Sequence, residues 1–187
     1  MKYIVLDTET AGLPVRKGWD TYHNPKQFDK YYSQCRLVEL AYVVYEDDVE
    51  ILRYENIIIP SNFTIDNSQF HNITTEIATM KGRDLTEVLN QLSTDIEGCS
   101  SIVGHNINFD IHILLAEAHR TGNNKLVNLI TKKKLFCTMT YGKVKMETYK
   151  SPKLTELYEF LYNKPLDQKH RALSDVMSIV DCYRKLV

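Results

Sequence analysis

Hydrophobic residues are grouped in short blocks along the chain, and the block at residues 3–6 leads directly into two acidic residues. Side chains on a strand alternate between its two faces, so Asp7 and Glu9 are expected to project side by side from one face of a strand. Gly12 and Pro14 follow and predict a turn after the strand. The first hydrophobic block is therefore expected to present a pair of neighbouring carboxylates.

The next hydrophobic blocks predict a β-hairpin. Residues 37–45 are almost continuously apolar and rich in Val and Tyr, and a similar pattern resumes at residues 51–59 after three acidic residues. Runs of β-favouring residues joined by a short polar turn are typical of antiparallel strands. Two shorter apolar runs, residues 101–104 and 135–138, are expected to be buried strands.

Residues 14–34 and 60–74 show neither the helical nor the strand period. The first segment carries many aromatic side chains, which indicates a loop packed on the body of the protein, with a stacking surface for bases as the alternative. These aromatic residues are Trp19, Tyr22, Phe28, Tyr31 and Tyr32. The second segment is mostly polar and is expected to be a loop.

Apolar positions at helical spacing, preceded by residues that cap helices, predict five helices. They are expected from Thr74 or Thr75 to Met80, from Asp84 to Ile96, from Asn108 or Asp110 to Arg120, from Ser151 to Leu161, and from Arg171 to Val187. Strands in antiparallel succession, followed by strands that alternate with helices, are typical of a mixed sheet. The pattern therefore predicts an α/β fold.

The composition is that of an ordinary globular domain. Its 187 residues fit one domain, residues 1–187, and 43% hydrophobic and 25% charged residues indicate no disorder. The four cysteines are scattered, so neither a disulfide framework nor a zinc site is expected. No signal-peptide core precedes Asp7, and no apolar run approaches the about 18 residues of a membrane span. An intracellular protein without membrane contact, cytoplasmic or nuclear in a eukaryote, is expected.

Positive charge is concentrated in residues 125–153, which hold eight lysines and one acid, although the formal net charge of the chain is −1. A basic segment beside an acidic body suits a surface that follows phosphates next to a metal site made of carboxylates. A solvated lysine-rich face explains the same pattern, and the charge distribution by itself does not separate the two.

Acidic residues also stand at the ends of other predicted elements. Asp110 falls in the first turn of a predicted helix, where the helix dipole stabilises an anion. Asp175 falls at the start of the last helix, with His170 in the loop before it. Crowded carboxylates repel one another unless a proton or a cation neutralises them, and their oxygens suit Mg²⁺ or Mn²⁺ better than zinc. Solvated acids at element ends are the simpler interpretation of each residue taken alone.

Three segments together resemble the exonuclease motifs of the DnaQ-like family. They are Asp7-x-Glu9, Asn106-x-x-Phe109-Asp110 and His170-x-x-x-x-Asp175, in this order. Residues 71–74, with the sequence His-Asn-Ile-Thr, are similar to the His-Gly-Ile-Thr of the family. The histidine placed five residues before the last aspartate resembles the DEDDh branch, whereas the sister branch has Tyr at the position of Arg171.

The resemblance implies a ribonuclease H-like mixed five-stranded sheet flanked by helices. It also implies a metal-dependent 3′-to-5′ exonuclease that releases nucleoside 5′-monophosphates from DNA or RNA ends by two-metal-ion hydrolysis. Two Mg²⁺ or Mn²⁺ ions would be held by Asp7, Glu9, Asp110 and Asp175, with Asp7 bridging both. His170 would be the general base, and the unperturbed histidine pKa of about 6.5 suits that role at neutral pH.

The resemblance further implies residues that bind the 3′ nucleotide. These are Thr10, Ala11, Gly12, Leu13, Asn106 and Phe109. Gly12 would allow close approach of the backbone, and Leu13 would wedge against the terminal base. Core packing is the rival role for Leu13 and Phe109. The expected partner is a single-stranded or frayed 3′ end of DNA or RNA.

Three alternatives stay open. The aromatic insert between Pro14 and Cys35 departs from the simplest members of the family, so the choice between DNA and RNA is not decided. The chain ends directly after its last predicted helix, which favours a free-standing enzyme, with a polymerase or a second copy of the chain left as a non-covalent partner. A catalytically inactive nucleic-acid-binding or scaffold relative is the alternative function.

Overall fold

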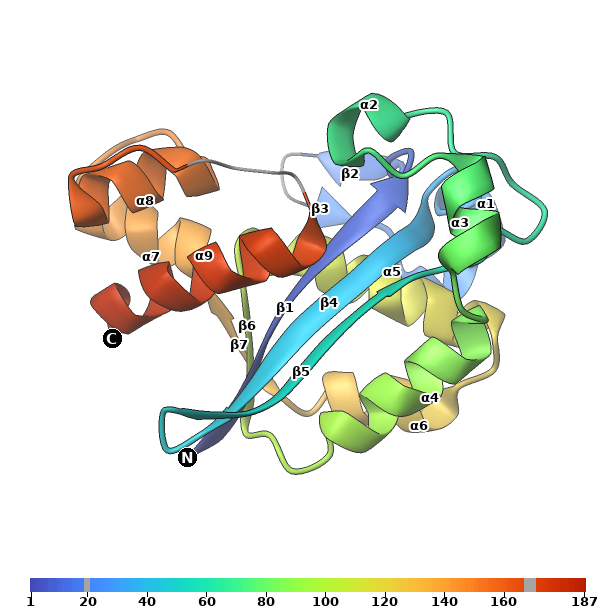
Figure 1. Cartoon of the computed structure of the whole chain (residues 1–187), viewed down its shortest axis with the longest axis horizontal. Coiled ribbons are helices and arrows are strands. Elements are labelled where there is room, and N and C mark those ends of the chain that lie inside the picture. Colours follow the sequence, from blue (N-terminus) through green and yellow to red (C-terminus); the bar gives the residue numbers. More distant parts are fainter. Residues whose placement is uncertain (19–20, 167–170) are drawn as a thin grey trace.

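A five-stranded mixed sheet forms the centre of the structure, a computed structural model that describes residues 1–18, 21–166 and 171–187 (Figure 1). The strand order is β5-β4-β1-β6-β7. Strand β4 is antiparallel to both β1 and β5, whereas β6 is parallel to β1 and β7 is parallel to β6. The strands are β1 (Lys2–Ala11), β4 (Arg36–Glu46), β5 (Val49–Ile57), β6 (Ser101–Gly104) and β7 (Lys134–Cys137). The predicted mixed α/β sheet is confirmed.

Helices cover both faces of the sheet, and alternation along β1 decides which side chains each face receives (Figure 1). One face is covered by α4 (Leu85–Asp95), α5 (Ile107–Arg120) and α6 (Asn124–Ile130), and the other by α7 (Thr138–Lys145), α8 (Leu154–Tyr162) and α9 (Ala172–Leu186). Ile4 and Leu6 belong to the first core, and Tyr3 and Val5 belong to the second. The odd-numbered residues that follow on β1 therefore face α9.

Side-chain caps explain where two of the predicted helices begin. Asp84 caps α4 by accepting hydrogen bonds from two backbone N–H groups of its first turn. Thr74 caps α3 (Thr75–Lys81) in the same way through one N–H group. Among the described residues, no helix is both long enough and apolar enough to cross a membrane.

Two other helix starts differ from the prediction. Helix α5 begins before Asn108, because Asn106 takes a left-handed conformation, with φ of 61°, and turns the chain from β6 into the helix. Helix α8 begins after Lys153 and not at Ser151, since the side chain of Glu156 accepts the backbone N–H of Lys153 at 2.7 Å. In both places a local hydrogen bond or backbone angle sets the boundary that the apolar spacing leaves undefined.

Several short elements occur where no period was visible. They are β2 (Arg16–Gly18), β3 (Thr21–Tyr22), η1 (Pro25–Gln27), α1 (Phe28–Tyr31) and α2 (Ser68–His71). The prediction of irregular structure across residues 14–34 and 60–74 is therefore wrong in these places, and α6 and α7 were not predicted. Elements of two to eight residues contain too few positions for a hydrophobic period to appear.

The aromatic insert packs on the start of α5, as expected. Tyr32 is fully buried, and Tyr22 is 7% exposed. The ring of Tyr22 lies 4.9 Å from the ring of His112 and 6.3 Å from that of Phe109, measured between centroids. Packing is thus confirmed for these side chains, whereas Trp19 lies outside the described residues.

Candidate metal centre

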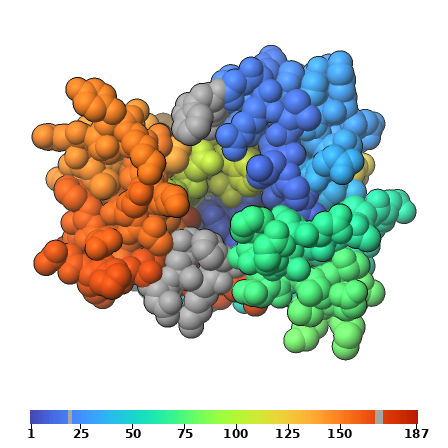
Figure 2. Space-filling view, turned by 90° about the horizontal axis from the view of Figure 1, so that it is seen from above, coloured from blue at the N-terminus to red at the C-terminus, as the bar shows by residue number. Residues whose placement is uncertain are grey.

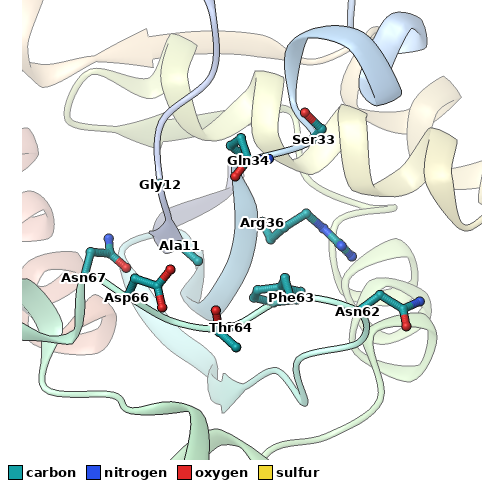
Figure 3. Close-up of a pocket in the computed structure, with 10 residues that line it drawn as sticks. All are labelled: Ala11, Gly12, Ser33, Gln34, Arg36, Asn62, Phe63, Thr64, Asp66 and Asn67. Atoms are coloured by element: carbon teal, nitrogen blue, oxygen red, sulfur yellow. The ribbon is translucent and has the colours of Figure 1, made fainter.

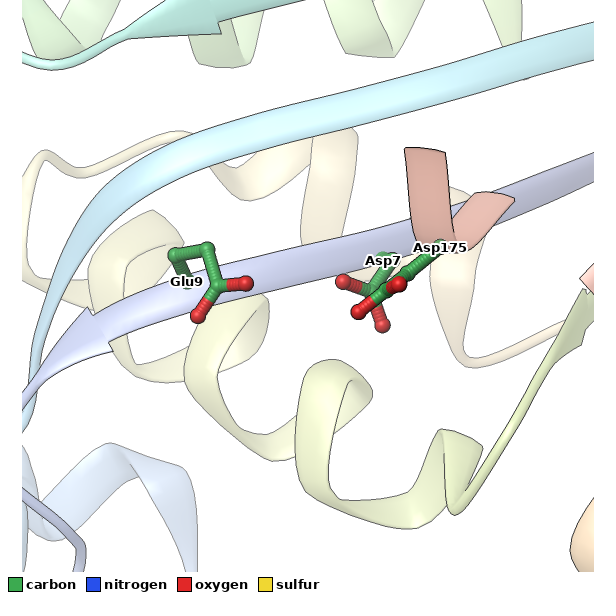
Figure 4. Close-up of side chains that lie close together, drawn as sticks. All are labelled: Asp7, Glu9 and Asp175. Carbon is green, nitrogen blue, oxygen red and sulfur yellow. The ribbon is translucent and has the colours of Figure 1, made fainter. Parts of the chain in front are cut away.

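Three carboxylates from distant parts of the chain meet beside the sheet (Figure 4). Asp7 and Glu9 project from β1, and Asp175 projects from the first turn of α9. One oxygen of each carboxylate lies within 4.8 Å of one oxygen of each of the others. Strand alternation puts the first two on the α9 face, and the packing of α9 on β1 brings the third to them. Their role as metal ligands stays a prediction.

Asp110 is held next to this group by contacts of its own. It is 3% exposed in the first turn of α5, and its Oδ1 accepts hydrogen bonds from the backbone N–H and the hydroxyl of Thr8 at 3.0 and 2.7 Å. Thr8 stands between Asp7 and Glu9, so β1 fixes Asp110 through the residue that separates the two acids. Sequence patterns missed Thr8, because this contact joins residues 102 positions apart.

Burial and mutual repulsion favour the protonated form of these acids. Burial raises the pKa of Glu9 to about 8, and neighbouring charges, with Asp175 foremost, add to the shift. Burial, followed by repulsion from Asp110 and Asp175, raises the pKa of Asp7 well above its usual value. Burial also raises the pKa of Asp110 to about 7, although its hydrogen bonds oppose the rise. Near neutral pH the group therefore needs protons or a cation.

A hard divalent cation fits this set of side chains. Asp7, Glu9 and Asp175 offer only oxygen atoms, and within the described residues the group contains no Cys or His. Mg²⁺ and Mn²⁺ prefer such donors, whereas zinc favours nitrogen and sulfur. A cation that replaced the protons would offset both the repulsion and the desolvation that raise these pKa values.

We expect the metal-free protein to lose stability as the pH rises. A carboxyl group whose pKa is higher in the folded than in the unfolded state binds more protons when folded, so the free energy of unfolding falls with pH between the two pKa values. For Glu9 this window runs from its usual 4.5 to about 8. Thermal melting in EDTA across this range would show the decline, and Mn²⁺ should remove most of it at the alkaline end.

Two substitutions make this experiment specific. Glu9→Gln should make the decline shallower, because one of the proton-binding groups is gone. Glu159→Gln, at an exposed position on α8, should leave the decline unchanged. A melting temperature in EDTA that does not vary with pH would contradict the picture of a crowded acid cluster.

The segment after the two acids of β1 is fixed by contacts within the chain. Gly12 has φ of +78°, and a Cβ atom there would lie 2.2 Å from the carbonyl oxygen of Gln34, so glycine is required. The hydroxyl of Thr10 donates to the carbonyl of Gly12, and the side chain of Asn67 donates to the carbonyl of Thr10. The close approach at Gly12 is thus to the chain itself. Leu13, 65% exposed, projects beyond this segment, and its contact with a nucleotide stays a prediction.

Asn106 and Phe109 lie at the start of α5. Asn106 is the N-cap residue, and its side chain makes no capping hydrogen bond. Phe109 is partly buried and packs against the first core, which contains Ile4 and Leu6, and against the ring of Tyr22. Core packing is therefore at least one role of the Phe109 side chain. The contact of Asn106 or Phe109 with a nucleotide stays a prediction.

The surface is hollowed in this region. Figure 2 shows a depression whose floor has the colour of the start of α5 and whose walls come from the insert, the α2–α3 segment and the α7–α8 region. A pocket of about 380 Å³ lies at the end of β1, between Ala11, Gln34 and Asn67 (Figure 3). Its lining, in the part of the chain that the structure describes, does not include Asp7, Glu9, Asp110 or Asp175. This pocket is therefore distinct from the candidate metal centre.

The predicted base, His170, lies outside the described residues. The next residue, Arg171, is described, and its guanidinium pairs with the buried carboxylate of Glu39. Glu39 stands directly opposite Glu9 in the β1–β4 register. The sequence analysis used Arg171 only to tell two branches of the family apart. It did not single out Glu39, because this residue lies outside the three motifs.

The sequence of the chain matches a family model, and its fold is similar to that of solved structures. Residues 4–183 match the family model RNase_T, described as Exonuclease, whereas a search of curated proteins found no significant match. A structure of E. coli exonuclease I in complex with a dT13 oligonucleotide has a TM-score of 0.74 at 15% identity, covering 100% of this chain and 40% of that chain. An exonuclease I from Methylocaldum szegediense has a TM-score of 0.67 at 15% identity, with the same coverage. This chain thus spans about 40% of the length of these structures, and the likeness shows the shared fold.

Proposed function

The chain belongs to the exonuclease family, whose model matches residues 4–183, and from this premise we propose that it is a divalent-metal-dependent 3′-to-5′ exonuclease of the DEDDh type. Residues 1–187 would form one exonuclease domain. One observation carries the proposal: Asp7, Glu9 and Asp175 converge to within 4.8 Å, with Asp110 beside them. Such crowding of acids is unfavourable without a cation, and a cation is what phosphodiester hydrolysis requires.

The residues of the site divide into ligands and a base. Two ions, Mg²⁺ or Mn²⁺, would be held by Asp7, Glu9, Asp110 and Asp175. When bound, these ions supply the activation of the attacking water and the neutralisation of the charge that develops on the leaving 3′ oxygen. Thr8 holds Asp110 in place through two hydrogen bonds. His170 is assigned the proton transfer.

Hydrolysis consumes one water for each nucleotide released. The water oxygen forms a bond to the phosphorus of the terminal phosphodiester, and the bond from that phosphorus to the 3′ oxygen of the preceding nucleotide breaks. His170 takes the proton that the water loses, and the 3′ oxygen gains a proton from solvent. The products are a nucleoside 5′-monophosphate and a shorter strand that ends in a 3′ hydroxyl.

Single-stranded 3′ ends are the proposed substrate. The E. coli exonuclease I structures that share this fold contain dT13 and dA16 oligonucleotides. On this chain α7, which forms part of the α7–α8 wall of the depression in Figure 2, belongs to the lysine-rich segment 125–153. Lys133 and Lys150 in that segment already contact acceptors of the protein. Lys145 is the last residue of α7 and Lys153 directly precedes α8, and both are exposed, so we assign phosphate contacts to these two lysines, on DNA or on RNA.

We expect Tyr149→Ala to raise the KM for a single-stranded oligonucleotide roughly 5- to 100-fold with little change in kcat, because stacking of one base on an aromatic ring contributes about 1–3 kcal/mol. Tyr149 is 100% exposed, and in the sequence it stands between Lys145 and Lys153. Steady-state kinetics on one oligonucleotide would measure the change. Met80→Ala, which removes an 82% exposed side chain from α3, is the control. An unchanged KM would remove Tyr149 from the substrate surface.

One assay tests the proposed function. A DNA or RNA oligonucleotide labelled at its 3′ end is incubated with the protein in Mg²⁺, in Mn²⁺ and in EDTA. The proposal requires labelled mononucleotide as the first product with metal and none in EDTA. A substrate labelled at its 5′ end should give a ladder of shortening strands. Release of mononucleotides in EDTA, or no release under any condition, would refute the enzyme.

A catalytically inactive nucleic-acid-binding or scaffold relative is the alternative. It would bind the same oligonucleotides without releasing mononucleotides in either metal. The retention of Asp7, Glu9, Asp110 and Asp175 favours the enzyme, because a scaffold gains nothing from buried acids that repel one another. An intracellular location, and a polymerase or a second copy of the chain as partner, remain proposals of the same kind.

A further inference from the structure

A fifth carboxylate, Glu39, is completely buried beside the candidate metal centre. It lies on β4, directly opposite Glu9 of β1, and none of the exonuclease motifs includes it. An unpaired charge at such a position is strongly unfavourable, so its partners decide what it does.

Both oxygens of Glu39 receive hydrogen bonds from the start of α9. The guanidinium of Arg171 donates through Nε to Oε1 and Oε2 at 3.1 and 3.2 Å, and through Nη2 to Oε1 at 2.5 Å. The backbone N–H of Ala172 donates to Oε2 at 3.0 Å. Arg171 also approaches Glu55 of β5, with 3.6 Å between Nη2 and Oε1. One buried side chain thus joins β4 to the helix that carries Asp175.

These contacts fix the orientation of the first turn of α9. Arg171 is the N-cap residue of α9, and its own side chain makes no capping hydrogen bond. The carboxylate of Glu39 takes over that role from another strand, because it accepts the N–H of Ala172, one of the groups that a helix start leaves unpaired. Asp175 lies one helical turn after Arg171, and its N–H donates to the carbonyl of Arg171 at 3.1 Å. Rotation or displacement of this turn would move the Asp175 carboxylate away from Asp7.

We propose that Glu39 and Arg171 are positioning residues for the metal centre: they clamp the start of α9 onto β4 so that the Asp175 carboxylate meets Asp7 and Glu9. Neither residue touches metal or substrate in this role. The inference rests on the proposed function, because it assumes that the three acids hold a metal ion.

The rival role for this pair is stability of the fold alone. Replacing a buried ion pair by apolar residues of similar volume is often neutral for stability or even stabilising, whereas removing one partner is strongly destabilising. The double variant Glu39→Leu/Arg171→Met is therefore expected to stay folded while it loses the clamp. Melting in EDTA measures the fold, and calorimetric titration with Mn²⁺ measures the metal centre.

We expect the double variant to melt close to the wild type in EDTA but to bind Mn²⁺ about 10- to 100-fold more weakly, as is typical when a residue that orients a metal ligand is lost. Arg171→Lys keeps the charge but loses the planar fork of donors, so its Mn²⁺ affinity should fall between those of the wild type and the double variant. If the double variant melts far below the wild type, the Mn²⁺ affinity of Arg171→Lys tests the clamp in its place. A folded variant with wild-type Mn²⁺ affinity overturns the clamp.

The chain offers a matched control on the same strand. Arg36 of β4 pairs with Glu117 of α5, with 2.9 Å between Nε and Oε1, and Glu117 is 1% exposed. The variant Arg36→Met/Glu117→Leu removes a buried pair of the same kind away from the start of α9. Its Mn²⁺ affinity should equal that of the wild type. A loss as large as that of the Glu39→Leu/Arg171→Met variant would show a general effect of ion pairs and would overturn the clamp.

Calorimetry separates the clamp from the proposed function. Wild-type protein that binds Mn²⁺ but releases no mononucleotides would refute the exonuclease and leave the weaker binding of the double variant as support for the clamp. Active wild-type protein with equal Mn²⁺ affinity in all folded variants would refute the clamp and leave the exonuclease. Wild-type protein that binds no Mn²⁺ would refute both.

Discussion

Replacing Asp7 by asparagine is expected to lower kcat by about 10³-fold or more, which corresponds to at least about 4 kcal/mol of lost transition-state stabilisation. Asp7 is central to the acid cluster: its pKa is raised by burial and by the charges of Asp110, Asp175 and Glu9. A neutral amide would remove the charge that attracts the cation at the point where the other acids converge.

The same substitution is expected to leave the fold intact and to raise its stability in EDTA. Removing one member of a group of repelling carboxylates relieves an unfavourable interaction in the metal-free protein, as often happens when functional residues are replaced. The stabilising effect of Mn²⁺ should shrink at the same time, since ligand binding stabilises the folded state in proportion to the logarithm of concentration over Kd. Thermal melting of wild type and Asp7→Asn, with and without Mn²⁺, measures both effects.

An exposed aspartate provides the control for this experiment. Asp29→Asn, at an exposed position of α1, should keep the activity and the response to Mn²⁺. If Asp7→Asn melted far below the wild type in EDTA, Asp7 would be a structural residue and the metal centre would be misplaced.

Replacing His170 by alanine is expected to lower kcat by about 10²- to 10⁴-fold, the range typical for loss of a general base. Binding of Mn²⁺ and of the oligonucleotide should persist, because the proposed ligands are all carboxylates. A mutation that lowers kcat without weakening binding removes an interaction made in the transition state. His119→Ala, on α5, is the matched control and should keep the full rate.

The pH dependence of the rate provides a second measure of this base. The wild-type rate should rise through the pKa of His170, which is about 6.5 for an unperturbed histidine, and the variant should lose that limb. Ionisations of groups other than His170 do not depend on its side chain, so the limbs that they produce should persist in both proteins. A variant with full rate, or one that no longer binds Mn²⁺, would exclude His170 as the base.

Local patterns in the sequence determined the sheet and the neighbouring position of two acids. The alternation in residues 3–9 predicted β1 and the shared face of Asp7 and Glu9, and the structure brings both into the cluster. The apolar spacing after Asp84 predicted α4 with its cap. These signals are legible because the side-chain period of a strand or a helix involves residues only two to four positions apart. The order of three motifs pointed to a family that the match over residues 4–183 confirms.

Short elements escaped these patterns. Strands β2 and β3, which pair antiparallel, hold their position through contacts such as that of Tyr22 with His112, and helix α2 comprises only Ser68–His71. Elements of this length have little stability of their own, so tertiary packing decides whether they form. Their sequences therefore carry no period that could have predicted them.

The tertiary structure alone decided how the acids are supported. Thr8 reaches Asp110 across 102 positions, and Arg171 reaches Glu39 across 132. Buried polar groups must find hydrogen-bond partners wherever the fold provides them. Those partners depend on the register between β1 and β4, on the packing of α9 over the sheet and on the entry of the chain into α5. Each of these arrangements is set by the burial of many side chains at once, and no short stretch of sequence contains that information.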